Sequence, residues 1–448
     1  MSQYRFILRD YHAIQEADIT IDGITVMSGI NGCGKSTLSR WLYYIIKGSI
    51  GFEDNLLRTY IQKLNSLVSR MLFVCRDIEI FKRTNNRLGS STQDKLYEIQ
   101  EKLRHIDRYS QQQVELALGL FLQASSTITD ALLRNLDENM PEVRKRRIMR
   151  YLDIDITDNN VQLSVDEFST RMSRIGNKLT SSLYQDIELR SVQRFLETLD
   201  QQFNTKDDHP SYIQLEEDGV NLIDEHLSNL YNLRNAIYID TPMSVTSDTS
   251  GNIFWNALRE MIMEGEKENI STEVKKLLLR IKILLDGQVF LEKEDDPFNS
   301  PKLRYVSSDQ QVNIKLNEVA TGFKTFSYLQ RLLENGYLNE ETLLMIDEPE
   351  AHLHPQWIVE FARMLVLLNK TLGLKIILAS HNPDMVSAIH DIAHKEGVLD
   401  NTNFYVAQPS DENRHQFVYK ALGHEISEIF KSFNIAIDRI KQYGTADL

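Results

Sequence analysis

The chain has 448 residues, of which 64 are acidic and 50 are basic, giving a formal net charge of -14. A chain of this length is expected to form two or three structural units, and its acidic balance excludes a broadly basic nucleic-acid surface but allows a local basic groove. Two cysteines exclude a disulfide scaffold and predict a cytoplasmic protein. The N-terminus shows no signal-peptide pattern, and apolar runs such as Leu343–Ile346 are too short to cross a membrane, so no membrane partner is expected.

Residues 1–51 begin with strand-like alternation. Tyr4–Leu8 and Ala17–Ile21 alternate as two paired strands do. Ile24–Ser28 indicates a short buried strand, and the apolar spacing that starts at Thr37 indicates a helix. The stretch that connects this strand to this helix reads Gly29-Ile-Asn-Gly-Cys-Gly-Lys35-Ser36-Thr37.

That stretch fits G-x-x-x-x-G-K-[ST], the loop that holds nucleotide phosphates. Its glycines allow a tight turn that points successive backbone N–H groups at a phosphate, and the positive end of the following helix faces the same point. Lys35 is expected to reach the β- and γ-phosphates, and the Ser36 hydroxyl to bind Mg²⁺. The nucleotide-binding residues predicted here are Gly29, Asn31, Gly32, Cys33, Gly34, Lys35, Ser36 and Thr37.

Residues 52–235 are predicted to form a mainly helical insertion. The segment is charged, and stretches such as Val114–Leu122 and Leu183–Leu199 have helical spacing. The apolar positions do not keep a seven-residue repeat over several heptads, so a long coiled-coil arm is not expected. A basic cluster has two interpretations, a solvated helix face or a contact for DNA, RNA or an acidic partner. Its members are Arg144, Lys145, Arg146 and Arg147, with Arg150 nearby.

Residues 236–448 return to strand character and are predicted to form a second lobe. Ala236–Asp240 indicates a strand, and Val289–Lys293 and Leu303–Val306 are expected to form a hairpin with an acidic loop. From residue 316 to about 408, helix and strand alternate as in an α/β sheet with covering helices.

Two carboxylates end an apolar strand in this lobe, Thr342–Glu348. Asp347 is expected to hold the Mg²⁺ shell, and Glu348 to polarise the attacking water. The alternative is a strand that ends in acidic residues at an ordinary loop. Because the same chain carries a phosphate loop, the catalytic interpretation is favoured.

A second buried strand, Lys375–Ser380, ends just before His381. Histidine at the carboxyl end of a strand lies on the edge where an open α/β sheet binds ligands. We expect His381 to contact the γ-phosphate and to respond to its loss. A histidine that caps the next helix is the alternative.

Taken in order, these motifs resemble the ABC-type ATPase head, a group that includes SMC-type, RecF-like and OLD-like ATPases and transporter subunits. Asp347-Glu348-Pro349 resembles the end of its Walker B strand, and Ser380-His381 is similar to its switch-histidine loop. Glu350–Pro355 falls at the D-loop, with His354 in place of the usual aspartate, and the run is more similar to the OLD and RecF-like group than to transporter subunits. The resemblance implies an α/β P-loop NTPase fold, the ABC-ATPase head, with a mixed sheet, a large mainly helical insertion, and ATP and Mg²⁺ as cofactors.

The signature element of that family departs from its usual form here. The segment in its place is Leu316–Phe326, in which Gly322 matches the signature glycine and Phe323 replaces an acidic or amide residue. The helix is expected to begin at about Phe326. Backbone N–H groups of this segment are expected to bind the γ-phosphate of a second subunit, and Lys324 to add charge; a plain helix cap is the alternative. The residues predicted to bind nucleotide across the interface are Thr321, Gly322 and Lys324.

The resemblance implies a homodimer or higher homo-oligomer held together through ATP. His352 and His354 are favoured as contacts in that dimer, because their spacing of two lacks the four-residue helical spacing of a zinc-enzyme motif. A metal site is the alternative.

The resulting hypothesis is a soluble ABC-type ATPase in which Lys35, Glu348 and His381 act in hydrolysis and which drives or gates a nucleic-acid-related or anti-phage effector. The variant signature resembles ATPases found with phage-defence modules. A built-in nuclease is not expected, because OLD-type proteins carry a Toprim domain longer than the residues that follow His381; a nuclease or toxin partner would do any cutting. An ATP-dependent scaffold or sensor with little turnover, and a transporter ATPase subunit, are the alternatives.

Overall fold

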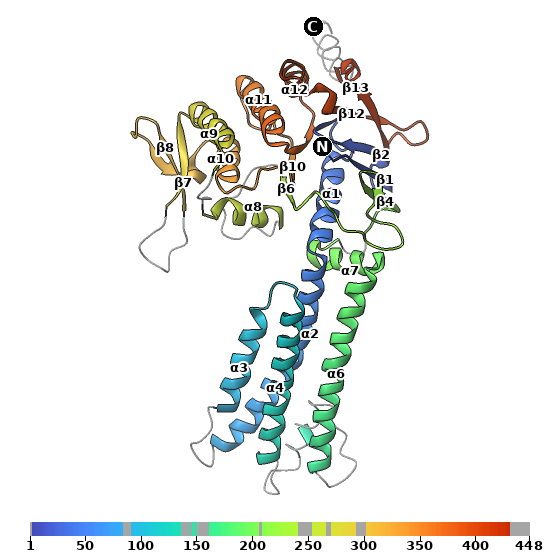
Figure 1. Cartoon of the computed structure of the whole chain (residues 1–448), viewed down its shortest axis with the longest axis vertical. Coiled ribbons are helices and arrows are strands. Elements are labelled where there is room, and N and C mark those ends of the chain that lie inside the picture. The colour runs from blue at the N-terminus through green and yellow to red at the C-terminus, as the bar shows by residue number, and fades with distance from the viewer. Residues whose placement is uncertain are drawn as a thin grey trace, which may run out of the picture. The chain divides into compact units, whose positions relative to one another are not determined.

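A computed structural model describes residues 2–83, 91–135, 143, 146–147, 150, 161–205, 208–240, 253–265, 270–292 and 302–430. The chain divides into two compact units (Figure 1). One unit, the head, consists of Met1–Ile50 and Leu199–Leu448, and the other, the helical unit, consists of Gly51–Thr198. Each unit is described by itself.

Ten described strands of the head form one mixed sheet in the order β5-β4-β1-β2-β13-β12-β3-β11-β10-β6. Its β12, β3, β11, β10 and β6 run parallel to one another, whereas β1 pairs antiparallel with both β2 and β4. The strands are β1 (Tyr4–Tyr11), β2 (Ile14–Ile21), β3 (Ile24–Ser28), β4 (Tyr212–Glu217), β5 (Val220–Asn221), β6 (Asn235–Ile239), β10 (Thr342–Asp347), β11 (Lys375–Ser380), β12 (Thr402–Pro409) and β13 (Phe417–Gly423).

Three of the parallel strands are buried over their whole length. Every residue of β3, β10 and β11 is buried, because helices cover both faces of a parallel sheet and select continuous apolar runs. In the register of these neighbours, Ser380 lies opposite Ser28, and Asp347 lies opposite Ala379. The carboxyl ends of three adjacent strands therefore meet at one edge of the sheet, which confirms the α/β P-loop class with a mixed sheet.

The described helices of the head are divided between this sheet and a smaller one, beside which α9 and α10 lie (Figure 1). The first helix packs against β6, β10 and β11. The smaller, antiparallel sheet of β7, β8 and β9 contains the predicted hairpin, whose acidic loop lies outside the described residues. These elements are α1 (Lys35–Ile50), α8 (Ile253–Met263), α9 (Thr272–Leu285), β7 (Gly287–Glu292), β8 (Lys302–Ser307), β9 (Asn313–Lys315), η1 (Leu316–Glu318), α10 (Thr321–Glu334), α11 (Pro355–Leu372), α12 (Pro383–Glu396) and η2 (Leu399–Asn401).

The helical unit contains α2 (Phe52–Arg83), α3 (Ser91–Arg104), α4 (Gln111–Asn135) and α6 (Val161–Leu189), with α7 (Val192–Phe203) crossing its boundary. The first four pack against one another as a bundle, as Figure 1 shows. This confirms the predicted helical character. Of the basic cluster, Arg144 and Lys145 lie outside the described residues, and the other three arginines occupy exposed helical positions.

The predicted end of the insertion at residue 235 is wrong. The helical unit ends at Thr198, and β4 pairs antiparallel with β1 in the head sheet. The charge of Glu217 hides this short strand from a search for alternating apolar residues. Glu217 is nevertheless buried, because Tyr4 Oη and the backbone N–H groups of Tyr231 and Asn232 donate hydrogen bonds to it.

One described helix, with the span Gln111–Arg134, is long and apolar enough by length and composition to cross a membrane. Polar residues interrupt its sequence, so the helix contains no long uninterrupted apolar run. Half of its most apolar window is buried inside the structure, as in the core helix of a bundle.

Candidate functional site

The phosphate loop joins β3 to α1 in a backbone form that requires glycine. Gly32 and Gly34 have φ angles of 83° and 97°, in the left-handed region that other residues rarely adopt. A Cβ atom at Gly34 would come within 2.6 Å of Ile14 Cγ1, whereas one at Gly32 would have no neighbour within 4 Å. The loop is therefore shaped both by its own dihedral angles and by close packing against β2.

Lys35 is the first residue of α1, so this helix begins two residues before the predicted start at Thr37. Its side chain is buried, and Nζ donates hydrogen bonds to the carbonyl oxygens of Gly29 and Ile30 at 2.9 and 3.1 Å. The first turn of α1 contains no acidic residue, which keeps its positive end free of competing carboxylates.

A pocket of about 330 Å³ lies over this loop. It brings six of the predicted phosphate-loop residues together with Glu348. Of the other two, Gly29 lies against Ala407, and Cys33 is buried beside Tyr419. The pocket is lined by His12, Ala13, Asn31, Gly32, Gly34, Lys35, Ser36, Thr37 and Glu348.

Asp347 ends β10 beside this loop and is buried. Burial raises the pKa of Asp347, a side-chain hydrogen bond from Ser36 opposes that rise, and the nearby Asp240 and Glu348 carboxylates add to it. Tyr238 Oη donates a further hydrogen bond at 3.3 Å. Burial is thus the main cost to the charged form of Asp347, and a positive charge beside it would favour that form.

This chemistry fits Mg²⁺, which binds through a few protein oxygens and completes its shell with water and phosphate oxygens. Ser36 and Asp347 supply a hydroxyl and a carboxylate next to each other. Among the residues that the structure describes, no group of three His, Cys, Asp or Glu side chains could hold a metal by itself.

Asp240 belongs to this region but was not predicted as a site residue. It follows β6, the strand beside β10, and its carboxylate accepts hydrogen bonds from Arg40 Nη2 at 3.2 and 3.3 Å. A signal was present, since the predicted strand Ala236–Asp240 ends in a carboxylate, as Thr342–Asp347 does. Asp240 can be recognised as a site residue only once β6 is known to be the neighbour of β10.

Glu348 and His381 approach each other across the ends of β10 and β11. Glu348 has a φ angle of 47°, and its N–H donates to Ala379 O at 2.8 Å. Its Oε1 lies 3.6 Å from His381 Nδ1. The structure thus brings together the two residues predicted to act on water and on the γ-phosphate.

The signature-like segment forms the start of α10. This helix begins at Thr321 with Ala320 as its N-cap, so the predicted start at Phe326 is too late. Phe323 packs its ring against Tyr305 and Trp357, which explains an apolar residue where the family usually has a polar one. Burial lowers the pKa of Lys324, whose Nζ donates to Asn317 O at 2.9 Å.

The phosphate-loop pocket has no described lining residue from this start of α10. Gly322 lies against the D-loop, where a Cβ would come 3.1 Å from Leu353 Cδ2. In the same loop, His352 has a φ angle of 63°, and His354 caps α11 by accepting from Gln356 N at 3.4 Å.

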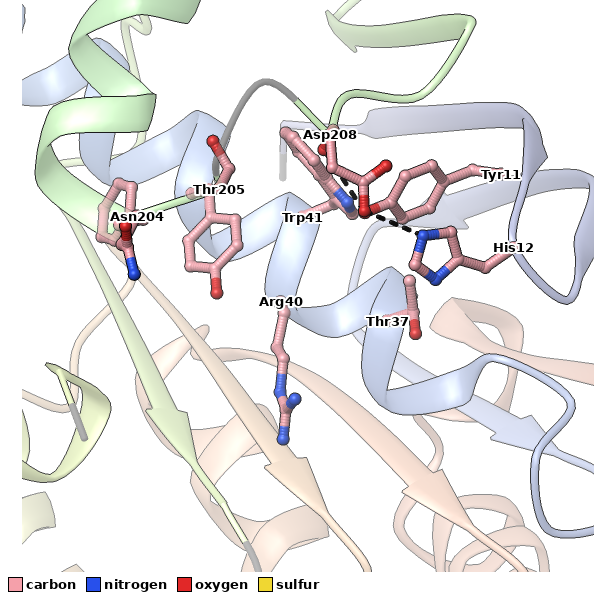
Figure 2. A pocket seen from close by; sticks show the side chains of 10 residues that line it. Tyr11, His12, Thr37, Arg40, Trp41, Asn204, Thr205 and Asp208 are labelled. Atoms are coloured by element: carbon pink, nitrogen blue, oxygen red, sulfur yellow. Dashed lines mark hydrogen bonds and ion pairs between the residues drawn. The ribbon is translucent and has the colours of Figure 1, made fainter. Parts of the chain in front are cut away.

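A second pocket, of about 270 Å³, shares His12 and Thr37 with the first. Figure 2 shows aromatic rings gathered around it. The rings of Tyr11 and His12 stack with centroids 4.1 Å apart, and Trp41 meets Tyr11 edge-on at 5.7 Å. His12 Nε2 lies 2.9 Å from Asp208 Oδ2. This pocket was not predicted, although the adjacent aromatic residues Tyr11 and His12 at the end of β1 could have indicated it.

The phosphate loop and the strand ends beside it are features expected of an ATPase, and a protein-family comparison gives the same class. The AAA ATPase domain profile matches residues 4–386. The chain belongs to the AAA ATPase domain family. This AAA ATPase is also similar to the Old nuclease of Escherichia phage P2, with 26% identity over 149 residues, which are 33% of this chain and 24% of that protein. The predicted OLD-like resemblance is thereby confirmed.

A second relative of this AAA ATPase is the energy-coupling factor transporter ATP-binding protein EcfA3 of Clostridium perfringens. It is 35% identical over 85 residues, which are 18% of this chain and 30% of that protein. The chain therefore spans less than a third of the length of either relative.

Among solved structures, the SMC head domain from Thermotoga maritima aligns over 94% of this chain and 99% of its own, with 10% identity and a TM-score of 0.34. An Smc head domain with an extended coiled coil, derived from Pyrococcus furiosus, aligns over 98% of this chain and 100% of its own, with 10% identity and a TM-score of 0.35.

Proposed function

We propose that this AAA ATPase binds Mg-ATP in the phosphate-loop pocket and hydrolyses it. The observation that supports this is the meeting of Lys35, Asp347–Glu348 and His381 at the ends of three adjacent strands. Such an arrangement places a phosphate cradle, a cation ligand and a candidate general base within one site.

Each residue has a distinct role in this proposal. Lys35 exchanges its two loop carbonyl partners for phosphate oxygens. Ser36 and Asp347 hold Mg²⁺, which neutralises phosphate charge when bound. Glu348 orients and deprotonates the attacking water, and His381 contacts the γ-phosphate. The raised pKa of Asp347, caused first by burial, supports the cation role, because a positive ion beside the carboxylate would favour its charged form and lower that pKa.

The aromatic pocket shown in Figure 2 is proposed to receive the base of ATP. It adjoins the phosphate pocket through His12 and Thr37. A flat base stacks on aromatic rings, and the Tyr11–His12 pair presents such a surface.

We propose further that a second copy completes the site and that ATP holds a homodimer or higher oligomer together. Thr321, Gly322 and Lys324 would meet the γ-phosphate from the other subunit through N–H groups at the start of α10. The Ala320 cap makes no side-chain hydrogen bond to those groups. The working protein would then be a cytoplasmic ATP-gated clamp.

The proposed partner of this clamp is a nuclease or toxin effector, in an anti-phage or other nucleic-acid-related role. The similarity to the Old nuclease supports this. DNA or RNA would contact the basic cluster, of which Arg146 and Arg147 are exposed.

The test is ATP turnover in Glu348→Gln. Losing a positioned general base should lower kcat by about 10²-fold or more while ATP still binds. Size-exclusion chromatography with light scattering should then show a dimer that persists in ATP. Glu341→Gln, an exposed carboxylate before the other end of β10, is the matched control. Normal hydrolysis by Glu348→Gln would remove Glu348 from the mechanism.

Two outcomes would favour the alternative functions. Wild-type protein that binds ATP and dimerises, but completes no turnover in a single-turnover assay, would favour a scaffold or sensor. Co-purification with a multi-spanning membrane protein would favour a transporter subunit, the class that the EcfA3 similarity supports.

A further inference from the structure

Glu350 is a buried carboxylate directly beside the candidate catalytic residues. It is 6% exposed. The Ser380 hydroxyl lies 2.9 Å from each of its oxygens, and the His381 backbone N–H donates to Oε1 at 3.0 Å. A carboxylate is costly to bury unless hydrogen bonds replace its water. These contacts supply that replacement, and they come from the short segment that carries His381.

The same carboxylate also faces the His381 ring. Nδ1 lies 3.2 Å from Glu350 Oε1 and 3.6 Å from Glu348 Oε1. Among the described groups, neither carboxylate makes an aligned hydrogen bond with Nδ1. The imidazole therefore lies against one carboxylate that belongs to the candidate chemistry and one that does not line the phosphate pocket.

A chain of hydrogen bonds connects Glu350 to the following helix. Ser380 Oγ accepts from the Asn382 backbone N–H at 3.1 Å. Asn382 in turn caps α12, with its side chain accepting from the Asp384 and Met385 N–H groups. His381 thus lies between the buried Glu350 carboxylate, which follows β10, and the capped start of α12.

We infer that Glu350 is a positioning residue, which holds the Ser380–His381 segment and orients the His381 ring toward the reaction. This inference rests on the proposed ATP hydrolysis. It predicts that losing Glu350 slows turnover through His381 and leaves nucleotide binding intact, since Glu350 is absent from the described lining of the phosphate pocket.

A double-mutant cycle tests this directly. Glu350→Gln should lower kcat by about 10-fold or more and change the Kd of a fluorescent ATP analogue by less than about 2-fold. In a His381→Ala background, Glu350→Gln should lower kcat no further, because residues that act as one unit are not additive. Independent, multiplicative losses would overturn the inference.

The matched control is Glu217→Gln, which removes another buried, multiply hydrogen-bonded carboxylate of the head. It should leave kcat unchanged. An equal loss of turnover in both variants would mean that any buried carboxylate has this effect, and the inference would fail. If Glu350→Gln does not give a cooperative thermal melt, Glu350→Asp, which keeps the charge, takes its place in the cycle.

A readout that needs no hydrolysis separates this inference from the proposed function. In protein labelled with ¹⁵N-histidine, the His381 ring signals are those lost in His381→Ala. Glu350→Gln should shift these signals and Glu217→Gln should not. If the wild-type protein does not hydrolyse ATP but Glu350→Gln shifts the His381 signals, the proposed hydrolysis is refuted and the positioning contact is retained. If the wild-type protein hydrolyses ATP but Glu350→Gln leaves the His381 signals unshifted, the hydrolysis is retained and the positioning inference is refuted.

Discussion

Asp347 illustrates how a single functional side chain opposes the stability of the fold around it. It is buried beside two other carboxylates, so in the metal-free protein its pKa is raised. The folded state then binds a proton at this carboxyl more tightly than the unfolded state does. Stability contributed by this group falls as the pH rises from the unfolded pKa toward the folded pKa, so its penalty is larger at neutral pH than near pH 4.

Replacing Asp347 by Asn should therefore stabilise the metal-free protein while it removes the proposed cation ligand. We expect Tm to rise by about 1–3 °C at pH 7, the gain to shrink as the pH falls toward 4, and ATP turnover to drop by about 10²-fold or more. Differential scanning calorimetry at both pH values measures the first two effects. Asp391→Asn, which removes an exposed carboxylate, should leave all three unchanged. A destabilised Asp347→Asn protein at pH 7 would contradict this account.

At the scale of elements, the phosphate loop depends on its neighbour β2 as much as on its own residues. Gly32 and Gly34 both have left-handed φ angles, but of the two only Gly34 would place an added Cβ against a side chain, that of Ile14. Substituting each glycine in turn therefore distinguishes the cost of backbone strain, expected at both, from the cost of a steric clash, expected only at Gly34.

Alanine at Gly32 should lower the free energy of unfolding by about 1–3 kcal/mol from backbone strain. Alanine at Gly34 should cause the same strain and a further loss of about 1–3 kcal/mol from overpacking against Ile14. Urea titrations of both variants measure the difference. In an Ile14→Ala background, which removes the Cγ1 atom, the extra loss at Gly34 should disappear. Equal losses at the two glycines in the wild-type background would refute the packing argument.

At the scale of the whole molecule, the division into two units suggests that each has its own core. Within the helical unit, apolar residues such as Phe121 and Ile128 are fully buried. A unit of this kind is expected to fold by itself.

We expect a fragment of residues 51–203, which keeps α7 whole, to be helical by circular dichroism and to melt cooperatively. Phe121→Ala should lower its stability by about 3–5 kcal/mol. Leu116→Ala, at a position 50% exposed on the same helix, should change it by about 0.5 kcal/mol or less. A gradual, non-cooperative melt of the fragment would contradict its independence.

The sequence by itself determined the parts of this ATPase whose chemistry is local. The glycines, Lys35 and Ser36 form one contiguous loop, and Asp347 and His381 each follow an apolar strand. Such features are readable because turn geometry, strand burial and phosphate binding each depend on a few neighbouring residues. The helical character of the insertion was readable for the same reason.

Only the tertiary structure decided which of these pieces meet. The strand order places β6 beside β10, which brings Asp240 toward Asp347, and the pairing of β4 with β1 moves residues 199–235 into the head. The contact of Glu350 with His381 arises in the same way, from two strand ends that are parallel neighbours. The order of the strands depends on burying both faces of the sheet at once. That requirement involves the whole fold, so no single segment of the sequence determines it.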